Sequence, residues 1–305
     1  MLSASLFSQK YSILMSVYAA VEPEHLRAAI DSMLAQTLAS DDFILVCDGP
    51  LTPGLDRVIA GYQARYPGMF RVQRLSPHQG LVAALNAGLP LCRHELVARM
   101  DSDDVSHPQR CARQVGILSR RPELAILSGT VLEFKDTPCQ ITGKRSLPES
   151  HTALLPFSGK RSPFNHPAVM YRKSAVAAVG GYRNCFPSFE DHDLWVRMLR
   201  SGFRGENLRE PLLFMRTGMG MYRRRGGRRY AWNLLRFHAE LRRKHWSTPA
   251  DFVLATLPHA LACLLPTRGL ALIYHRLHRK GENHGYPNPD RRHHALRPRR
   301  CIPGL

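Results

Sequence analysis

The sequence predicts an α/β domain built on a mainly parallel sheet, followed by a basic helical extension. Short apolar segments alternate with segments of helical periodicity through residues 11–120. Acidic residues follow two of the expected strands, at the edge where parallel sheets bind ligands. Lys and Arg are concentrated after residue 211. We therefore expect one domain over residues 1–215 and a partly amphipathic extension with a disordered tail over residues 216–305.

The alternation of strand and helix is clearest in the amino-terminal half. Each expected strand is a short apolar run, as in a parallel strand buried on both faces. The expected strands cover residues 11–18, 43–47, 70–75 and 95–100. The expected helices cover residues 23–36, 55–65, 80–89 and 108–120. Pro23 and Pro108 open two of these helices, where the fixed φ of proline suits the first turn.

The second half of the domain is less regular. Strands are expected at 124–134 and 168–171, and helices at 173–179 and 191–201. Residues 135–165 are polar and contain four prolines, which predicts a mobile region with room for one helix. Such a segment would be able to close over a bound ligand and exclude water.

Positive charge separates the extension from the domain. The net charge is +19, yet residues 1–211 hold 24 Lys/Arg against 20 Asp/Glu, and residues 212–305 hold 19 against 4. After the basic run Arg223–Arg229 we expect two basic amphipathic helices. Their apolar stripes consist of Tyr230, Leu234, Phe237 and Leu241, and of Leu270, Ile273, Tyr274 and Leu277. Such helices bind anionic membrane surfaces with the apolar face inserted; residues 281–305 are expected to be poorly ordered.

Cysteine usage and hydropathy exclude several classes of protein. The seven cysteines are widely spread with no C-x-x-C pair, which argues against a disulfide framework and a zinc site and fits a reducing compartment. No secretory signal is expected at the amino terminus. Residues 252–267 are uncharged for 16 residues but contain two prolines, so we expect a buried or interfacial segment and not a membrane span.

Two acidic clusters are the candidate functional residues. Asp101-Ser102-Asp103-Asp104 directly follows the expected strand 95–100, and Asp48 ends another strand. Carboxylates this close repel one another unless a cation joins them, and Mg²⁺ takes oxygen ligands and usually brings phosphate. The second cluster, Glu190-Asp191-His192-Asp193, is a candidate source of a general base. A solvated turn and helix N-capping are the respective alternatives.

Five segments together resemble family-2 glycosyltransferases of the GT-A fold, of the bacterial type that adds single sugars to exopolysaccharide or lipopolysaccharide. They lie within residues 10–215 and comprise Ser12–Tyr18, Ser32–Thr37, Asp48-Gly49, Gly80–Asp104 and Asn165–Arg197. The resemblance implies an inverting transfer of a hexose or N-acetylhexosamine from a UDP-sugar. It also implies a divalent metal, Mg²⁺ or Mn²⁺, and a saccharide acceptor that we expect to be lipid-linked.

The resemblance assigns expected roles to individual residues. Asp191 matches the catalytic base, Asp103 a metal ligand, and Asp101 a ligand of the metal or of the ribose. The expected nucleotide-side residues are Tyr18, Asp48, Gly80, Arg99 and Asp101. The expected acceptor-side residues are Glu190, His166, His192 and Trp195. Open alternatives are a turn role for Asp48, core positions for Tyr18, Trp195 and the histidines, and an aspartate partner for Arg99.

The chain departs from the family pattern at two positions near the nucleotide. His78 and Ala19 stand where asparagine is common, which leaves base preference open. The Gln-x-x-Arg-Trp motif of processive members is absent, which favours a single addition. We expect a peripheral enzyme at the cytoplasmic face of the inner membrane, with no nucleic-acid partner. The alternatives are a basic nucleic-acid-binding protein, prompted by a pI of about 10.2, and a non-catalytic nucleotide-sugar-binding protein.

Overall fold

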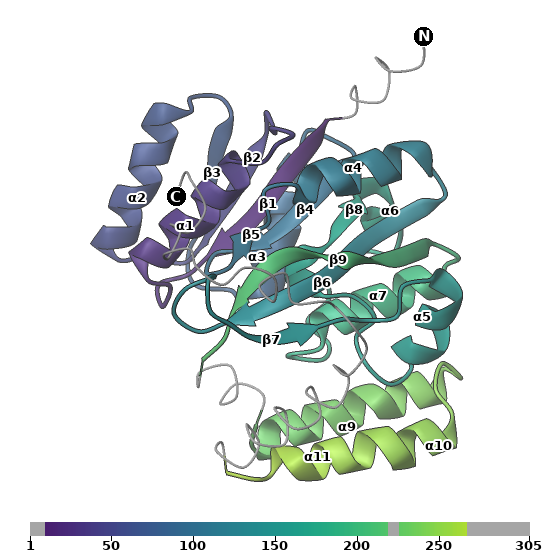
Figure 1. The fold of residues 1–305 in the computed structure, drawn as a ribbon. Coiled ribbons are helices and arrows are strands. Elements are labelled where there is room, and N and C mark those ends of the chain that lie inside the picture. The colour runs from purple at the N-terminus through teal and green to yellow at the C-terminus, as the bar shows by residue number, and fades with distance from the viewer. Residues whose placement is uncertain (1–9, 219–225, 267–305) are drawn as a thin grey trace, which may run out of the picture.

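The structure is a computed structural model that describes residues 10–218 and 226–266. One nine-stranded sheet runs through it with helices on both faces, and a helical hairpin lies at one end, at the bottom of Figure 1. The strand order is β3-β2-β1-β4-β8-β6-β9-β5, with β7 paired to β6. The predicted α/β class is confirmed.

The amino-terminal half follows the predicted alternation. Its strands are β1 (Tyr11–Val17), β2 (Phe43–Asp48), β3 (Phe70–Leu75) and β4 (Leu96–Asp101), all mutually parallel where they pair. The helices between them are α1 (Pro23–Leu34), α2 (Pro53–Arg65) and α3 (Leu81–Gly88), the last continued by the 3₁₀ turn η1 (Leu89–Leu91). Because all three parallel pairs run in register, the carboxyl ends of β1, β2 and β4 meet at one edge of the sheet.

Alternate strand residues face two separate apolar layers. On one face, Ile13 and Met15 of β1 belong to a cluster with α1, α2 and α4 (Arg110–Arg120). On the other, Leu14 belongs to a cluster that includes residues of α3 and α7 (Glu190–Arg200). This double cover explains why the strand residues of β1 and β2 are buried throughout, apart from a half-buried Ser16.

The second half of the sheet is mixed. Its elements are β5 (Val105–Ser106), α4 (Arg110–Arg120), β6 (Leu124–Phe134), β7 (Ile141–Arg145), α5 (His151–Ser158), η2 (His166–Ala168), β8 (Met170–Arg172), α6 (Lys173–Ala178), α7 (Glu190–Arg200) and β9 (Arg204–Arg216). β8 is antiparallel to β4 and β6, whereas β6 and β9 are parallel. The region 135–165, expected to be mobile with one helix, contains both β7 and α5.

The long strand β9 has no counterpart among the sequence-based expectations. Its sequence is polar and contains Pro211, which cannot donate a ladder hydrogen bond. The structure places Pro211 opposite Thr130, where the register between β6 and β9 shifts, so the missing donor coincides with an irregularity. Leu212 and Leu213 beyond it are fully buried, and the strand ends at Arg216 beside the acidic cluster.

The hairpin consists of α9 (Arg228–Arg243), α10 (Pro249–Asp251), the π-helical turn η3 (Phe252–Thr256) and α11 (Leu257–Cys263). In α9 the residues Leu234, Phe237 and Leu241 are buried in a cluster with Phe189 and Val196. The expectation that this stripe inserts into a membrane is therefore wrong, because the stripe packs against the domain. The second expected amphipathic helix and the tail lie outside the described residues, as do residues 223–225 of the run Arg223–Arg229.

None of the helices in residues 10–218 and 226–266 is both long and apolar enough to cross a bilayer. The predicted boundary at residue 215 falls at the last strand positions of β9. The extension nevertheless shares a hydrophobic cluster with Phe189 and Val196 at α7, so its independence as a folding unit stays a prediction.

Candidate active site

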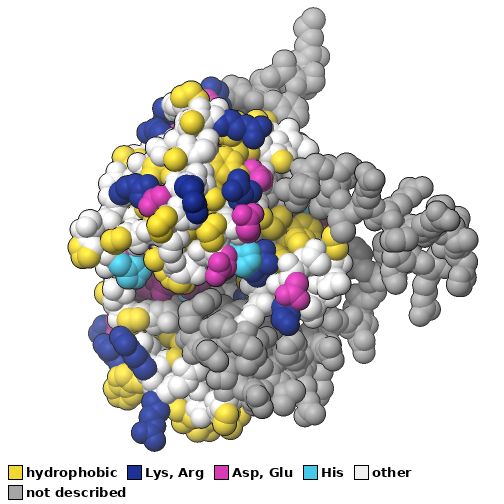
Figure 2. Space-filling view, turned by 90° about the vertical axis from the view of Figure 1, so that its left-hand side faces the viewer, with side chains coloured by type: hydrophobic (Ala, Val, Ile, Leu, Met, Phe, Trp, Pro, Cys, Tyr) yellow, Lys and Arg dark blue, Asp and Glu magenta, His cyan; other side chains and the backbone are white. Residues whose placement is uncertain are grey.

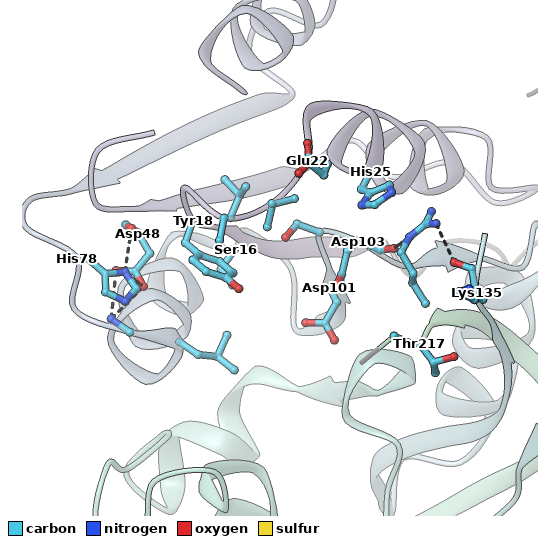
Figure 3. A pocket seen from close by; sticks show the side chains of 18 of the residues that line it. Ser16, Tyr18, Glu22, His25, Asp48, His78, Asp101, Asp103, Lys135 and Thr217 are labelled. Atoms are coloured by element: carbon cyan, nitrogen blue, oxygen red, sulfur yellow. Dashed lines mark hydrogen bonds and ion pairs between the residues drawn. The ribbon is translucent and has the colours of Figure 1, made fainter. Parts of the chain in front are cut away.

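A cavity of about 1030 Å³ opens at the carboxyl ends of β1, β2 and β4. Figure 3 shows it between two groups of side chains, with Asp48 and His78 at one end and Asp101, Asp103, Lys135 and Thr217 at the other. Tyr18 and Ser16 lie between the two ends, and Glu22 and His25 line it from the start of α1. Of the expected site residues, the cavity therefore brings together Tyr18, Asp48, Gly80, Asp101 and Asp103.

Asp48 organises the loop that precedes α3. Its carboxylate accepts hydrogen bonds from the backbone N–H of Gln79 at 2.7 Å and of Gly80 at 2.9 Å. Nδ1 of His78 lies 2.9 Å from the same carboxylate. Gly80 adopts φ +91°, in the left-handed region that favours glycine. A Cβ on Gly49 would lie 2.9 Å from the backbone of His78, so the Asp-Gly pair is what lets His78 approach.

Two rings flank this end of the cavity. Tyr18 is 42% exposed, so it is not a core residue. Its ring centroid lies 6.2 Å from that of His78, with a tilt of 34° between the rings. An exposed aromatic ring beside a polar loop is suited to stack on a planar heterocycle. His78, the departure from the family pattern, thus lies at the cavity wall.

Arg99 lies behind the acidic cluster and not on the cavity wall. It is 2% exposed, and one of its terminal nitrogens lies 2.5 Å from Oδ1 of Asp101. Burial opposes its charge, but the nearby Asp101, Tyr182 and Asp104 hold the pKa of Arg99 above its ordinary value. The aspartate partner, one of the two alternatives for Arg99, is present, and its contact with a diphosphate stays a prediction. Arg99 therefore orients the Asp101 carboxylate.

The end of β9 closes the acidic side of the cavity. The backbone N–H of Arg216 donates to Oδ1 of Asp104 at 2.8 Å, and Nε donates to the backbone carbonyl of Asp103 at 3.0 Å. Burial, together with the charges of Asp101 and Asp103, raises the pKa of Asp104 well above its usual range. Asp104 is therefore a structural carboxyl, and Asp101 and Asp103 are the two that face the cavity.

Gln36 fixes the chain that follows the acidic cluster. Its side-chain amide donates to the backbone carbonyl of His107 at 2.9 Å and lies 3.2 Å from Oγ of Ser106. Its carbonyl oxygen accepts the N–H of Cys111 at 2.9 Å. This buried amide joins α1 to the segment between Asp104 and α4.

The donor set fits a divalent cation that also binds phosphate. Among the described residues no group of three His, Cys, Asp or Glu side chains converges as a complete metal site. Asp101 and Asp103 supply two carboxylates on the cavity wall. Mg²⁺ is usually held by one or two carboxylates, with the other ligands coming from substrate phosphates and water. The residues present match that mode and not a cage made by protein alone.

The second acidic cluster opens α7, outside the cavity lining. Asp191 is half-buried, and Oγ of Ser162 donates to its Oδ2 at 3.2 Å. Burial and the neighbouring Asp191 charge raise the pKa of Glu190, while the charge of Arg99 opposes that shift. The charge of Arg99 therefore acts on both acidic clusters.

Asn86 of α3 is hydrogen-bonded to the loop between α6 and α7. Its side-chain amide donates to the backbone carbonyl of Tyr182 at 2.8 Å and accepts the Tyr182 N–H at 2.9 Å. The Tyr182 hydroxyl in turn lies 3.0 Å from Nε2 of His166. Burial and the charge of Arg99 lower the pKa of His166 well below its ordinary value, so this ring is neutral.

Two of the expected acceptor-side residues are core residues instead. Trp195 is fully buried and packs edge-on against Phe164 at 5.6 Å between ring centroids. His192 is also buried, and its Nε2 donates to the backbone carbonyl of Ser158 at 2.6 Å. Both predictions are wrong because the face of α7 that carries these side chains packs inward. Glu190 and His166 stay half-buried near Arg99 and Tyr182.

Several lining residues were missed in the sequence analysis. Arg216 is the last residue of β9, a strand that was not expected, and its place follows from the long-range pairing of β9 with β5 and β6. Lys135 directly follows the expected strand 124–134 but was not singled out. Glu22 and His25 lie at the start of α1, where an acidic residue is also expected at any helix start, and they have no strand-end position.

Comparison with known proteins places this geometry in a family. The family model described as Glycosyl transferase family 2 matches residues 12–226. The UDP-Gal:alpha-D-GlcNAc-diphosphoundecaprenol beta-1,3-galactosyltransferase of Escherichia coli is 34% identical over 271 residues, which cover 89% of this chain and 97% of that protein. The amylovoran biosynthesis glycosyltransferase AmsE of Erwinia amylovora is 32% identical over 278 residues, which cover 89% and 100%.

Solved structures share the fold. The mannosyltransferase PcManGT from Pyrobaculum calidifontis, in complex with GDP-Man and Mn²⁺, gives a TM-score of 0.60 at 16% identity and covers 89% of this chain and 81% of that chain. S. aureus TarS 1-349 in complex with UDP gives 0.51 at 16% identity, with 92% and 95% covered. The GT-A fold expected from the sequence is thereby confirmed. The chain belongs to glycosyltransferase family 2, and it is a glycosyltransferase.

Proposed function

We propose that this enzyme moves a single hexose or N-acetylhexosamine from a UDP-sugar to a lipid-linked saccharide, with inversion, in cell-surface polysaccharide biosynthesis. The E. coli relative supports these substrate classes, because its name gives UDP-Gal as donor and a diphosphoundecaprenol-linked sugar as acceptor. The Erwinia amylovora relative supports the pathway class, because its name gives amylovoran biosynthesis. An acceptor that carries a lipid favours a peripheral position at the cytoplasmic face of the inner membrane.

The observation that carries the proposal is the two-ended cavity. One end has the exposed ring of Tyr18 beside Asp48 and His78, and the other has the carboxylates of Asp101 and Asp103. A nucleoside diphosphate has matching ends, since its base is planar and its phosphates attract a cation. The base would lie near Tyr18, with Asp48 holding the loop at Gly80 in place.

Asp101 and Asp103 would hold the Mg²⁺ or Mn²⁺ ion. When bound, such an ion offsets the negative charge that develops on the departing diphosphate. Arg99 keeps the Asp101 carboxylate in one orientation from behind, at 2.5 Å. A carboxylate fixed before the ligand arrives loses less conformational entropy on binding.

Asp191 would take the proton from the acceptor hydroxyl as its oxygen attacks the anomeric carbon. A bond forms between that oxygen and the anomeric carbon while the bond from this carbon to the diphosphate oxygen breaks. Attack from the side opposite the leaving group inverts the configuration. Ser162 holds one oxygen of the Asp191 carboxylate, and Glu190 keeps a raised pKa beside it.

Two substitutions separate binding from chemistry. Asp191→Asn should lower kcat for transfer by about 10²- to 10⁴-fold while UDP binding, measured by calorimetry with Mn²⁺, stays unchanged. Asp103→Asn should remove the metal dependence of UDP binding. Glu24→Gln, an exposed change on α1, is the matched control for both. Transfer by Asp191→Asn at close to the normal rate, or metal-dependent UDP binding that survives Asp103→Asn, would show the assignment to be wrong.

A further inference from the structure

The outer side of η3 and α11 is an apolar surface without a partner among the described residues. We call it the hairpin face. It consists of Val253, Leu254, Leu257, Leu261, Leu264 and Leu265, which are between 38% and 77% exposed. Their spacing follows the helical repeat, so they form one stripe. Trp232 on the neighbouring α9 is also 62% exposed.

The stripe is outward because the other side of the same helices is already used. Thr256, Ala260 and Cys263 are buried, and the last two belong to the cluster with α9 and α7. The N–H of Gly227 at the start of α9 donates to the carbonyl of Cys263 at 2.7 Å, which fixes the antiparallel arrangement. No rotation of α11 can hide the leucines without exposing this packed side.

The hairpin that carries the apolar stripe holds more cations than anions. Residues 226–266 hold six Lys/Arg and two Asp/Glu. Glu240 pairs with Arg243 and Lys244, and Asp251 pairs with Lys160. Within the described ranges no carboxylate lies within ion-pair distance of four exposed arginines, Arg228, Arg229, Arg236 and Arg242. In Figure 2 hydrophobic side chains gather at the lower end of the molecule with Lys and Arg beside them.

We propose that the hairpin face inserts into the interfacial region of an anionic bilayer. The uncharged apolar stripe would contact the acyl chains of such a bilayer. The four arginines, which have no carboxylate partner among the described residues, would contact its anionic headgroups. A second copy of the chain fits less well, because a two-fold contact through this face would bring arginines against arginines. The purpose of the contact rests on the proposed function, since it brings the enzyme to a lipid-linked acceptor.

The hairpin also connects this surface to the catalytic domain. Phe189, directly before α7, stacks on Phe237 of α9 at 5.3 Å with 14° between the rings. It also contacts Tyr230, again at 5.3 Å. Asp191 follows two residues later. Binding of the hairpin face to a bilayer would therefore determine where α7 and its carboxylates lie relative to the membrane.

The test is vesicle co-sedimentation of the full chain. Wild type should bind vesicles of phosphatidylcholine with phosphatidylglycerol, and bind phosphatidylcholine alone more weakly. Leu254→Gln with Leu261→Gln should lower the partition coefficient about 100-fold. Arg229→Gln with Arg236→Gln should lower it about 20-fold on the anionic vesicles only. Two control variants, Ile141→Gln on β7 and Arg57→Gln on α2, change exposed residues that are not part of the hairpin. Both should leave vesicle binding unchanged.

Four outcomes would overturn the inference. They are no vesicle binding by the wild type, full binding by the leucine variant, arginine variants with undiminished binding, and a dimer in solution that the leucine variant converts to monomer without any vesicle binding. Mn²⁺-dependent UDP binding should be normal in all these variants. If UDP binding were absent from the wild type while vesicle binding followed the pattern above, the proposed function would fail and the membrane face would stand.

Discussion

The contact between α7 and the hairpin should weaken on mild acidification, because it buries two neutral histidines. His192 and His238 are each 3% exposed, and their ring centroids lie 5.9 Å apart. Burial lowers the pKa of His192 to about 4. Burial, with the nearby His192 and His259, lowers the pKa of His238 to about 3. In the unfolded chain both rings would titrate near about 6.5.

The sign of the effect follows from these values. Above about pH 6.5 both rings are neutral in the folded and unfolded states, so the full stability is present. As the pH falls below 6.5, the two histidines become protonated in the unfolded chain but stay neutral in the folded protein. Stability is therefore lost progressively until the pH reaches the pKa values of the folded state. One pKa unit corresponds to about 1.4 kcal/mol, so the step from pH 7 to pH 5 removes about 2 kcal/mol for each histidine.

Urea unfolding at pH 7.5, 6 and 5 measures this loss. His192→Gln and His238→Gln keep a side-chain N–H but cannot titrate, so each should remove about 2 kcal/mol of the pH dependence. His245→Asn is the control, because His245 is exposed and its φ of 56° is one that asparagine tolerates. The difference between wild type and variant isolates the histidines from carboxylates elsewhere. An unchanged pH slope in the double variant would refute the reasoning.

Three further substitutions test other parts of the fold. Asp42→Ala should lower the unfolding free energy by about 1–3 kcal/mol, because it leaves the Ser12 hydroxyl and the Arg93 N–H without their carboxylate acceptor; urea midpoints measure this. Asn86→Ala should cost about 2 kcal/mol by removing both hydrogen bonds to Tyr182, and kcat for transfer should fall more than donor KM rises if Asn86 positions α7. Trp195→Leu should lower the melting temperature, because the Trp195 ring is fully buried. The acceptor KM should be unchanged in the protein that remains folded; a raised acceptor KM with an unchanged melting temperature would instead show that Trp195 contacts the acceptor.

The parallel half of the sheet was predictable because its signals are local. β1, β2 and β4 are largely apolar runs, β3 alternates apolar and polar residues, and the sequence between these strands carries a helical period of its own. β9 lacks a local signal: its pairing with β6 depends on a partner some eighty residues earlier, and its polar residues and Pro211 oppose a strand assignment. The residues on β9 that complete the cavity were missed for the same reason.

Side-chain direction limited what the sequence could say about the site. Asp48 and Asp101 were predictable at the cavity because they end parallel strands, and strand ends share one edge. Trp195 and His192 lie on a helix whose two faces are not distinguished by position alone. A sugar-facing and a core position were equally open for Trp195, and for His192 a surface or core position was the preferred alternative to an acceptor contact. Both side chains are core residues because α7 packs on the sheet through Trp195 and on α9 through His192. The same holds for α9, whose apolar stripe has the period of a membrane-binding helix and is buried by the domain.

α7 is held from both sides, and this connects the charge asymmetry of the chain to its chemistry. Asp193 pairs with Arg197 at 2.8 Å, and Arg197 donates onward to the carbonyl of Gly181 at 2.7 Å, so the helix is tied to the turn before it. Its other side carries Phe237 of the hairpin. The hairpin therefore packs against Phe189, two residues before Asp191. If the hairpin face binds a membrane as proposed, this contact would couple that surface to the position of the proposed base.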